Sequence, residues 1–396
     1  MDNVHSQTHP RNRTPLACCL IALLAASCFP HFATAQSVRR PIEVFGYFQN
    51  GFEQQYDTQS KRRSTTFVMQ QLNLFFQKEL GNDLTSFVNF ETVNSFSSYR
   101  RWGAFNLEEA WLRYRTGRSS NIKVGLQIPI FNNLNEISNR TPILPYALRP
   151  LVYETSFNEI IPNEEYVPNR AFVQYYGFHQ TDLAKIDYAA YLGNGPNING
   201  GYDNDQTENS LRTGVDTSQT VLVGGRVGLR SSHVKVGLSG TLEHTNLLKV
   251  VDTELAEALD IPTSDLLDLT QVRLGGDFSA EYRSFEIESE FIMVRIKDPS
   301  PVVSLRRTFY YVMLGKWLGE RTFGFVSMMS TFDKFDTPIV FQLADVDVPT
   351  FGVAVHLSDA LTAKGQYAYA MVNVEEDLRI HKERLHYFAF ALSVVL

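Results

Sequence analysis

Hydrophobic and polar residues alternate with a period of two along most of the chain. One face of the final segment carries Phe388, Phe390, Leu392, Val394 and Leu396. The segment 122–130 repeats the pattern, with apolar residues at every even position and Lys123, Gly125 and Gln127 between them. On this pattern Ile128 and Ile130 belong to the apolar face. Alternation of this kind predicts β-strands that are apolar on one side.

Sixteen such segments can be recognised, most of them near ten residues or longer. Their approximate spans are 42–52, 65–80, 84–94, 107–116, 122–131, 169–179, 185–194, 220–230, 234–246, 269–283, 285–296, 307–318, 322–331, 348–358, 362–373 and 385–396. The connections alternate between short turns, such as 81–83, and long loops, among them 53–64, 332–347 and 374–384. Short turns at one rim and long loops at the other are typical of outer-membrane β-barrels.

A soluble propeller or sandwich is the alternative, because it also contains alternating strands. Soluble strands average about five or six residues, however, and a soluble fold gives no reason for connections of alternating length. No apolar stretch after the N-terminal segment is long enough for a membrane-spanning helix. We therefore expect an all-β fold, a transmembrane antiparallel β-barrel of about 16 strands with short periplasmic turns and long extracellular loops.

The N-terminus has the pattern of an export signal. A polar region with two arginines, 1–15, precedes an apolar run of eleven residues, 16–26. The small-x-small sequence Ala33-Thr34-Ala35 follows. This order predicts a secretory signal peptide, 1–35, that is cleaved after Ala35. Residues 36–396 would then form the barrel in the cell outer membrane.

All three cysteines lie in the first 28 residues. Cleavage would leave an exported chain with no thiol, which excludes disulfides and cysteine-based metal sites. Lipidation of Cys28 is the alternative, but the residue three positions earlier is alanine rather than a larger aliphatic, and a good cleavage site follows. The formal net charge of −7 argues against a nucleic-acid partner.

Residues 107–131 read LEEAWLRYRTGRSSNIKVGLQIPIF. This hairpin resembles one in porins of the phosphate-selective porin O/P-like family, in which an acidic-Ala-aromatic strand is followed by Val-Gly-Gln-x-x-Pro-aromatic. Here Gln127 comes one residue later than in that pattern, and Pro129 follows. Segments 169–177 and 189–196 are also similar to the family. The resemblance implies a sixteen-stranded barrel, usually a homotrimer, that passes small hydrophilic solutes and contacts outer-membrane lipid and lipopolysaccharide.

The third long connection, 132–168, is the longest at 37 residues. In a barrel of this class the third long loop usually folds inward and narrows the lumen, so we expect a constriction loop here. Its prolines favour a stiff, non-helical path. The predicted pore-lining and constriction residues are Arg113, Arg115, Lys123, Arg140, Arg149, Arg170, Arg226, Arg230, Glu109, Glu154 and Glu159.

Charged residues on the alternating strands are assigned to the lumen, because a charge facing lipid near mid-bilayer costs about 2–4 kcal/mol. The clearest case is the row Glu286, Glu288 and Glu290, which alternates with apolar residues. The wall is therefore expected to be polar and the solute hydrophilic. One hypothesis follows for the basic wall residues 113, 115, 123, 226 and 230. They would face the acidic third loop and create a transverse field.

Basic and acidic wall residues are nearly balanced, and no ladder of lysines is present. Because rings of like charge set ion selectivity, the phosphate label is not carried over. The expected function is a general or weakly selective diffusion porin for small hydrophilic solutes or ions. A substrate-specific channel for phosphate, another anion or an organic acid is the alternative.

Other classes have weaker support. The histidines after residue 35 are scattered, with no HExxH pair, and Gly237-Leu238-Ser239-Gly240 lies within a strand rather than in a nucleophile elbow. We expect no enzyme, cofactor or metal, although an outer-membrane hydrolase or an adhesin stays open. A fatty-acid channel would need an apolar lumen and an N-terminal hatch. The segment 252–269 suits a short helix that caps the pore or a solvated surface loop.

Overall fold

The structure is a computed structural model, and it describes most of the chain after residue 40. The described ranges are 41–95, 104–137, 140–153, 166–168, 170–194, 221–245, 269–297, 304–335, 343–376 and 379–396. The predicted signal peptide lies outside them, as does the expected helix apart from Leu269, which begins a strand. No helix among the described residues is long and apolar enough to cross a membrane.

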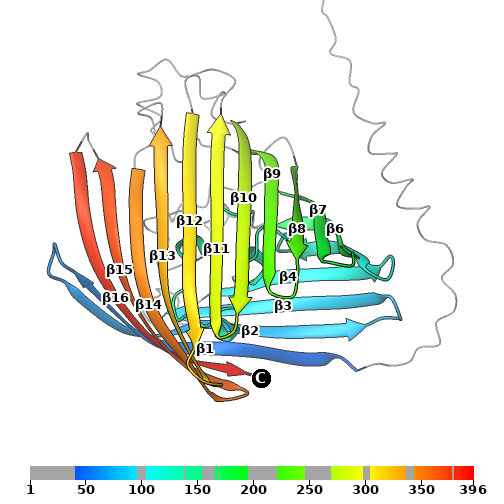
Figure 1. The fold of residues 1–396 in the computed structure, drawn as a ribbon, viewed down its shortest axis with the longest axis horizontal. Helices are drawn as coiled ribbons and strands as arrows, with labels where there is room; N and C mark the ends of the chain where they lie inside the picture. Colours follow the sequence, from blue (N-terminus) through cyan, green and yellow to red (C-terminus); the bar gives the residue numbers. More distant parts are fainter. Residues whose placement is uncertain are drawn as a thin grey trace, which may run out of the picture. The chain divides into compact units, whose positions relative to one another are not determined.

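Sixteen antiparallel strands form one closed barrel in the described part of the chain (Figure 1). They are β1 (Glu43–Asp57), β2 (Arg63–Glu79), β3 (Leu84–Ser95), β4 (Ala104–Arg115), β5 (Ser120–Gln127), β6 (Ala171–Gln180), β7 (Lys185–Gly193), β8 (Leu222–Arg230), β9 (Val234–Thr245), β10 (Leu269–Tyr282), β11 (Phe285–Lys297), β12 (Ser304–Trp317), β13 (Thr322–Phe335), β14 (Leu343–Ser358), β15 (Leu361–Glu376) and β16 (Arg379–Val395). Each strand pairs with its neighbours in sequence, and β1 closes the ring on β16, from Tyr47 opposite Val395 to Asp57 opposite Leu385. The predicted fold class is confirmed.

Each predicted strand overlaps one observed strand, but several strands extend further at the end that carries the long loops. β1 continues to Asp57, β14 begins at Leu343 and β16 begins at Arg379. The expected loops 53–64, 332–347 and 374–384 are correspondingly too long. The extensions were missed because polar residues occupy both faces there, so hydrophobic alternation fades while backbone pairing continues.

The outward face of the barrel is apolar, as the alternation predicts. In β16, Phe388 and Phe390 are 49% and 53% exposed, whereas Ala389 and Ala391, which alternate with them, are buried against other inward side chains. The same pattern holds on β8, where Val227 is exposed and Arg226 is buried. The closed, hydrogen-bonded wall that a membrane requires therefore presents an apolar outer face to lipid.

The prediction for the end of β5 is wrong. The strand ends at Gln127, after a bulge that follows Val124 and a Gly125 with φ of 122°. Because a bulge shifts the alternation by one residue, Ile128 is buried and Ile130 lines a cavity instead of facing lipid. Both residues begin the chain segment that enters the barrel.

The expectation of a polar inner wall fails on one side of the barrel. Inward residues of β11–β16 form an apolar cluster that includes Val294, Phe309 and Val348, each 0% exposed. Phe325 lies across Gly352 of the adjacent β14, where a Cβ would collide with its ring. The other part of this cluster comes from residues between 131 and 167, which belong to the connection between β5 and β6.

Candidate functional site

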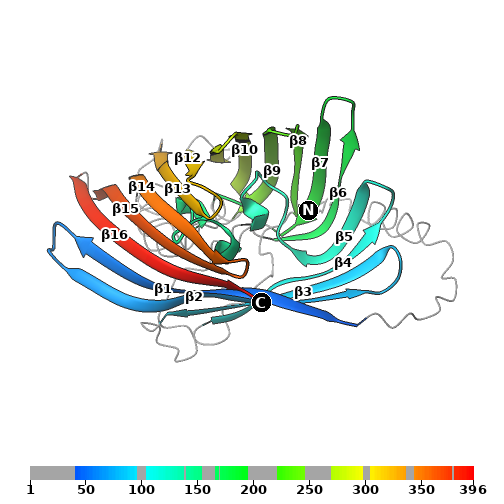
Figure 2. The same ribbon diagram turned by 60° about the horizontal axis from the view of Figure 1, so that its bottom comes forward.

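The connection between β5 and β6 lies inside the barrel. Its described part contains three short 3₁₀ turns, η1 (Asn135–Ile137), η2 (Thr141–Ile143) and η3 (Leu151–Tyr153), which Figure 2 shows within the ring of strands. The segment makes hydrogen bonds to β1, β6, β9, β11 and β15. Only the lumen gives one segment access to strands all round a closed barrel.

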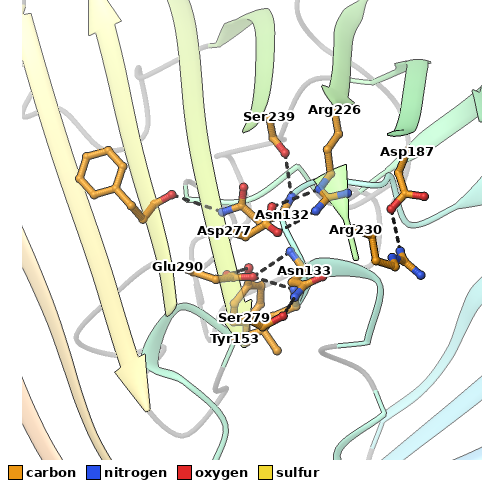
Figure 3. Close-up of polar contacts among 12 residues, drawn as sticks. Asn132, Asn133, Tyr153, Asp187, Arg226, Arg230, Ser239, Asp277, Ser279 and Glu290 are labelled. Carbon is orange, nitrogen blue, oxygen red and sulfur yellow. Dashed lines mark hydrogen bonds and ion pairs between the residues drawn. The ribbon is translucent and has the colours of Figure 1, made fainter. Parts of the chain in front are cut away.

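Glu290 of β11 binds the start of this segment and its third turn. One carboxylate oxygen accepts the backbone N–H groups of Asn133, at 2.9 Å, and Leu134, at 2.7 Å. The other oxygen accepts the hydroxyl of Tyr153 at 2.8 Å. Figure 3 shows Asn133 directed at Glu290. One buried carboxyl group therefore joins two parts of the segment to the wall.

A glycine on β10 makes room for the same entry point. A Cβ at Gly275 would collide with Oδ1 of Asn132 and would lie 2.8 Å from Cζ of Phe131. Asn132 adopts φ of 51°, a conformation that asparagine tolerates better than most residues. Its backbone N–H donates to Oγ of Ser239 on β9 at 2.9 Å. The missing side chain at Gly275 thus lets the chain approach the wall closely at this point.

The middle of the segment is held by β15. Lys364 Nζ donates to the carbonyl oxygens of Thr141 and Pro142, at 2.7 and 3.2 Å, and to Gln49 Oε1 at 2.9 Å. Gln366 Oε1 accepts the backbone N–H groups of Ala147 and Leu148 at 2.9 and 2.8 Å. These contacts satisfy backbone groups that would otherwise be buried without partners.

Two cavities of about 540 and 500 Å³ remain on the other side of the segment. The first is lined by β4–β8, and the second by β1–β6 and the C-terminus of β16. Arg113, Glu136 and Tyr176 line both cavities and therefore mark the boundary between them. The wall around these cavities carries the charges that the sequence assigned to the lumen.

The structure brings seven of the eleven predicted site residues to these cavities. Arg113, Arg115, Arg226 and Arg230 line the first, and Arg113, Lys123, Glu109 and Arg140 line the second. Arg170 lies elsewhere, with Nη1 donating to the carbonyl oxygen of Glu108 at 3.0 Å. Arg149 is half-buried in the segment between η2 and η3. Glu154 and Glu159 lie outside the described residues.

Three of the predicted arginines pair with wall carboxylates, Arg170 among them through Glu108 at 3.7 Å. Arg226 contacts Asp277 through two hydrogen bonds, of 3.1 and 2.7 Å, and both side chains are buried (Figure 3). Arg230 pairs with Asp187 at 2.9 Å. Among the described residues no carboxylate forms an ion pair with Arg113 or Arg115. Arg113 instead donates to Oγ1 of Thr85 at 3.0 Å.

Lys123 is held between two aromatic rings. Its Nζ lies 4.7 Å from the centroid of Trp111 and 5.2 Å from that of Tyr176. Trp111 in turn stacks on Phe87, with centroids 4.8 Å apart, and donates its indole N–H to Glu109 at 2.8 Å. Cation–π contacts fix the ammonium group without neutralising its charge. Sequence reasoning missed Trp111 and Tyr176, although both share the inward face with their charged neighbours.

The described loop charges face wall charges of the opposite sign at two places. Glu136 lies within electrostatic range of Lys123 and Arg226, and Arg140 lies beside it. Burial raises the pKa of the Glu136 carboxyl, and these cations oppose that effect. Arg149 lies near Glu91 of β3. The described part of the loop therefore presents both signs, while four of the glutamates that make the loop acidic in the sequence lie outside the described residues.

Two wall residues that hold the loop were also missed. Lys364 and Gln366 lie on the inward face of β15, and Tyr367 and Tyr369 lie on its outward face. The alternation in the sequence places them in the lumen, but it gives no sign of which loop atoms they would bind. Which loop atoms they bind depends on the tertiary path of the loop.

Comparisons with known proteins bear on the fold. No known family's sequence profile matches the chain, and no curated protein matches it. The outer membrane channel DcaP of Acinetobacter baumannii is similar in structure, with a TM-score of 0.57 at 10% identity over 90% of this chain and 97% of that one. The anion-selective porin from Comamonas acidovorans has a TM-score of 0.55 at 11% identity, over 90% and 99%.

The trimer form of OmpT, an outer membrane protein of Vibrio cholerae, is similar as well, with a TM-score of 0.55 at 10% identity over 90% and 100%. At such identities the likeness concerns the fold alone, which is the closed antiparallel β-barrel described above. Membership of the phosphate-selective porin O/P-like family stays a prediction.

Proposed function

We propose that the protein is a porin, a diffusion channel for small hydrophilic solutes or ions in the outer membrane, and that it has no enzymatic activity. The observation that carries the proposal is the pair of charged cavities, about 540 and 500 Å³, left between the inner segment and the wall. A polar, water-accessible lumen inside a closed apolar belt is what such diffusion requires. The inward segment 132–168 acts as the constriction loop.

The similar proteins support the outer-membrane location and the trimeric assembly in this proposal. Two of them are described as a channel and as an anion-selective porin, and a third was solved in a trimer form. We therefore extend the proposal to a homotrimer in contact with outer-membrane lipid and lipopolysaccharide, exported by cleavage after Ala35. No cofactor, metal or nucleic acid takes part in it.

The charges around the cavities favour weak selectivity for anions. Arg113, Arg115 and Arg118 of the first cavity have no ion-paired carboxylate among the described residues, while its acidic lining residues are Glu136 and Asp187, and Asp187 is paired with Arg230. Lys123 adds a fixed charge in the second cavity. A substrate-specific channel for phosphate, another anion or an organic acid is the second candidate, and this excess of cations is the observation that favours it.

Loop and wall together would produce a transverse field. Arg113 and Lys123 lie on one side and Glu136 on the other, while Arg149 near Glu91 gives a second pair of opposite polarity. Fixed charges facing each other in a narrow space orient dipolar solutes as they pass.

Single-channel recording tests the function directly. The refolded protein, checked by its heat-modifiable migration, should give stable open steps in a planar bilayer, in groups of three for a trimer. Reversal potentials in a salt gradient should show a modest preference for anions. A folded barrel that gives no steps would contradict the porin proposal and would favour an adhesin, a hydrolase or a structural barrel.

A further inference from the structure

The outward face of β11–β13 carries a cluster of cations at the long-loop end. Arg295 of β11 lies opposite Arg306 of β12, and Arg306 lies opposite Lys334 of β13. Lys297 is two residues further along the same face of β11. All four side chains are exposed. The three strands lie side by side in Figure 1, so these residues form one patch, which we call the rim cluster.

The position of Arg306 along β12 places the cluster at the edge of the apolar belt. Between Arg306 and Lys316 the outward face of the strand carries Thr308, Tyr310, Val312 and Leu314. Ten residues of strand rise about 34 Å, and a tilt of about 40° reduces this to about the 25 Å height of the apolar band of such barrels. The two cations therefore bracket the hydrocarbon layer, with Arg306 at the level of the headgroups on the long-loop side.

The charges of the rim cluster are not balanced within the described part of the protein. No described carboxylate forms an ion pair with Arg295, Arg306 or Lys334. Asp345 and Asp347 of β14 border the patch, and Asp347 already accepts the hydroxyl of Ser330. Like charges directly opposite each other on paired strands are destabilising. A row of three such cations therefore leaves an excess of positive charge on this face of the described strands, to which an external anion could bind.

We propose that the rim cluster binds the phosphate groups of a phosphorylated lipid of the outer leaflet, of the lipid A type. Arg295, Arg306 and Lys334 supply charge-assisted donors at headgroup height, and phosphate matches the geometry of the guanidinium groups. Phe332, beside Lys334 and 5.5 Å from Tyr310 between ring centroids, provides an apolar surface for the adjoining acyl chains. This site lies outside the barrel, so it is separate from the proposed solute pathway.

Native mass spectrometry of the intact barrel in detergent tests the proposal. The barrel is titrated with bis-phosphorylated lipid A and with the same lipid after its phosphates are removed. The double variant Arg295→Gln, Arg306→Gln should bind the phosphorylated lipid about 25-fold more weakly, because each cation at a charged lipid surface contributes a factor of about five. The dephosphorylated lipid should bind the unaltered barrel as weakly as that variant binds the phosphorylated one.

Lys316→Gln is the matched control, because Lys316 lies on the same face of the same strand at the opposite edge of the belt. It should leave lipid binding unchanged. Heat-modifiable migration shows whether each variant is folded, and Lys297→Gln with Lys334→Gln replaces the first pair if that pair does not fold. Unchanged binding by a folded variant, an equal loss in Lys316→Gln, or equal binding of both lipids would overturn the proposal. The site rests on the outer-membrane location in the proposed function, but no current is measured, so failure of lipid binding can be told apart from failure of the porin proposal.

Discussion

The two sides of the barrel differ in what occupies the space inside them. Along β11–β16 many inward side chains are apolar, apart from the polar groups that bind the loop, and the loop packs on them with residues such as Leu151 and Val152, both 0% exposed. Along β4–β8 the inward side chains are charged and border the cavities. Burying an aliphatic or aromatic side chain contributes about 1.5–3 kcal/mol. The apolar wall therefore determines where the loop lies, and the charged wall is left for water and solutes.

Removing the carboxylate of Glu290 should disturb this arrangement most. Glu290→Ala leaves the backbone N–H groups of Asn133 and Leu134 and the hydroxyl of Tyr153 without an acceptor. At about 1 kcal/mol for each lost hydrogen bond, the free energy of unfolding should fall by about 3 kcal/mol. The loop should move away from the apolar wall, and single-channel recording should show a noisier current of altered size.

Glu286→Ala is the control for this change. Glu286 lies on the same face of β11, but it accepts the indole N–H of Trp317 at 2.6 Å and makes no described contact with the loop. Its removal should lower stability without altering the current. Equal current changes in the two variants would show that Glu290 does not hold the loop.

A smaller disturbance comes from adding one methyl group at the entry point of the loop. The Cβ of Gly275→Ala would collide with Asn132 Oδ1, so the chain near Phe131 must shift, at a cost of about 1–3 kcal/mol. Gly240→Ala is the matched change, because the nearest atom to a Cβ there is 3.6 Å away. Denaturant titration should separate the two variants. If Gly240→Ala costs as much, the close approach at Gly275 has no special role.

The sequence predicted the barrel well and its interior only in part. Alternation identifies a strand such as β16 because one face meets lipid along its whole length. It cannot distinguish an inward face that meets water from one that meets protein. Val294 and Arg226 both face inward, one against the loop and one beside a cavity. Which of the two occurs depends on the path of the connection between β5 and β6.

That path could not be read from local pattern. The contacts that fix it join residues far apart in the chain, as between Ala147 and Gln366 or between Leu134 and Glu290. The charged set around the cavities was largely predicted, because charges on an alternating strand have only the lumen in which to remain hydrated. The pairing of Arg226 with Asp277 was not, since register across three strands decides it.

On the charged side, Arg113→Ala together with Arg115→Ala should shift selectivity. Both arginines line the first cavity, and neither has a described ion-paired carboxylate. Charges near water interact by about 1 kcal/mol or less, so we expect the anion-to-cation permeability ratio to fall about three- to five-fold. Reversal potentials in a salt gradient measure it. Arg170→Ala, away from the cavities, is the control. Unchanged selectivity and conductance in the double variant would refute the transverse field.

The smallest expected effect concerns acidification. Because burial raises the pKa of Glu136, this carboxyl takes up its proton at a higher pH than an ordinary glutamate. As the pH falls through that range, a negative charge disappears beside Lys123 and Arg140, and the anion-to-cation permeability ratio should rise by about two-fold, in line with the small energies of such charge pairs. Glu136→Gln should lose this step, whereas Asp182→Asn, in the exposed turn between β6 and β7, should keep it. If the change in selectivity persists in Glu136→Gln, another wall carboxylate causes it, and the loop carboxylate does not influence permeation through the cavities.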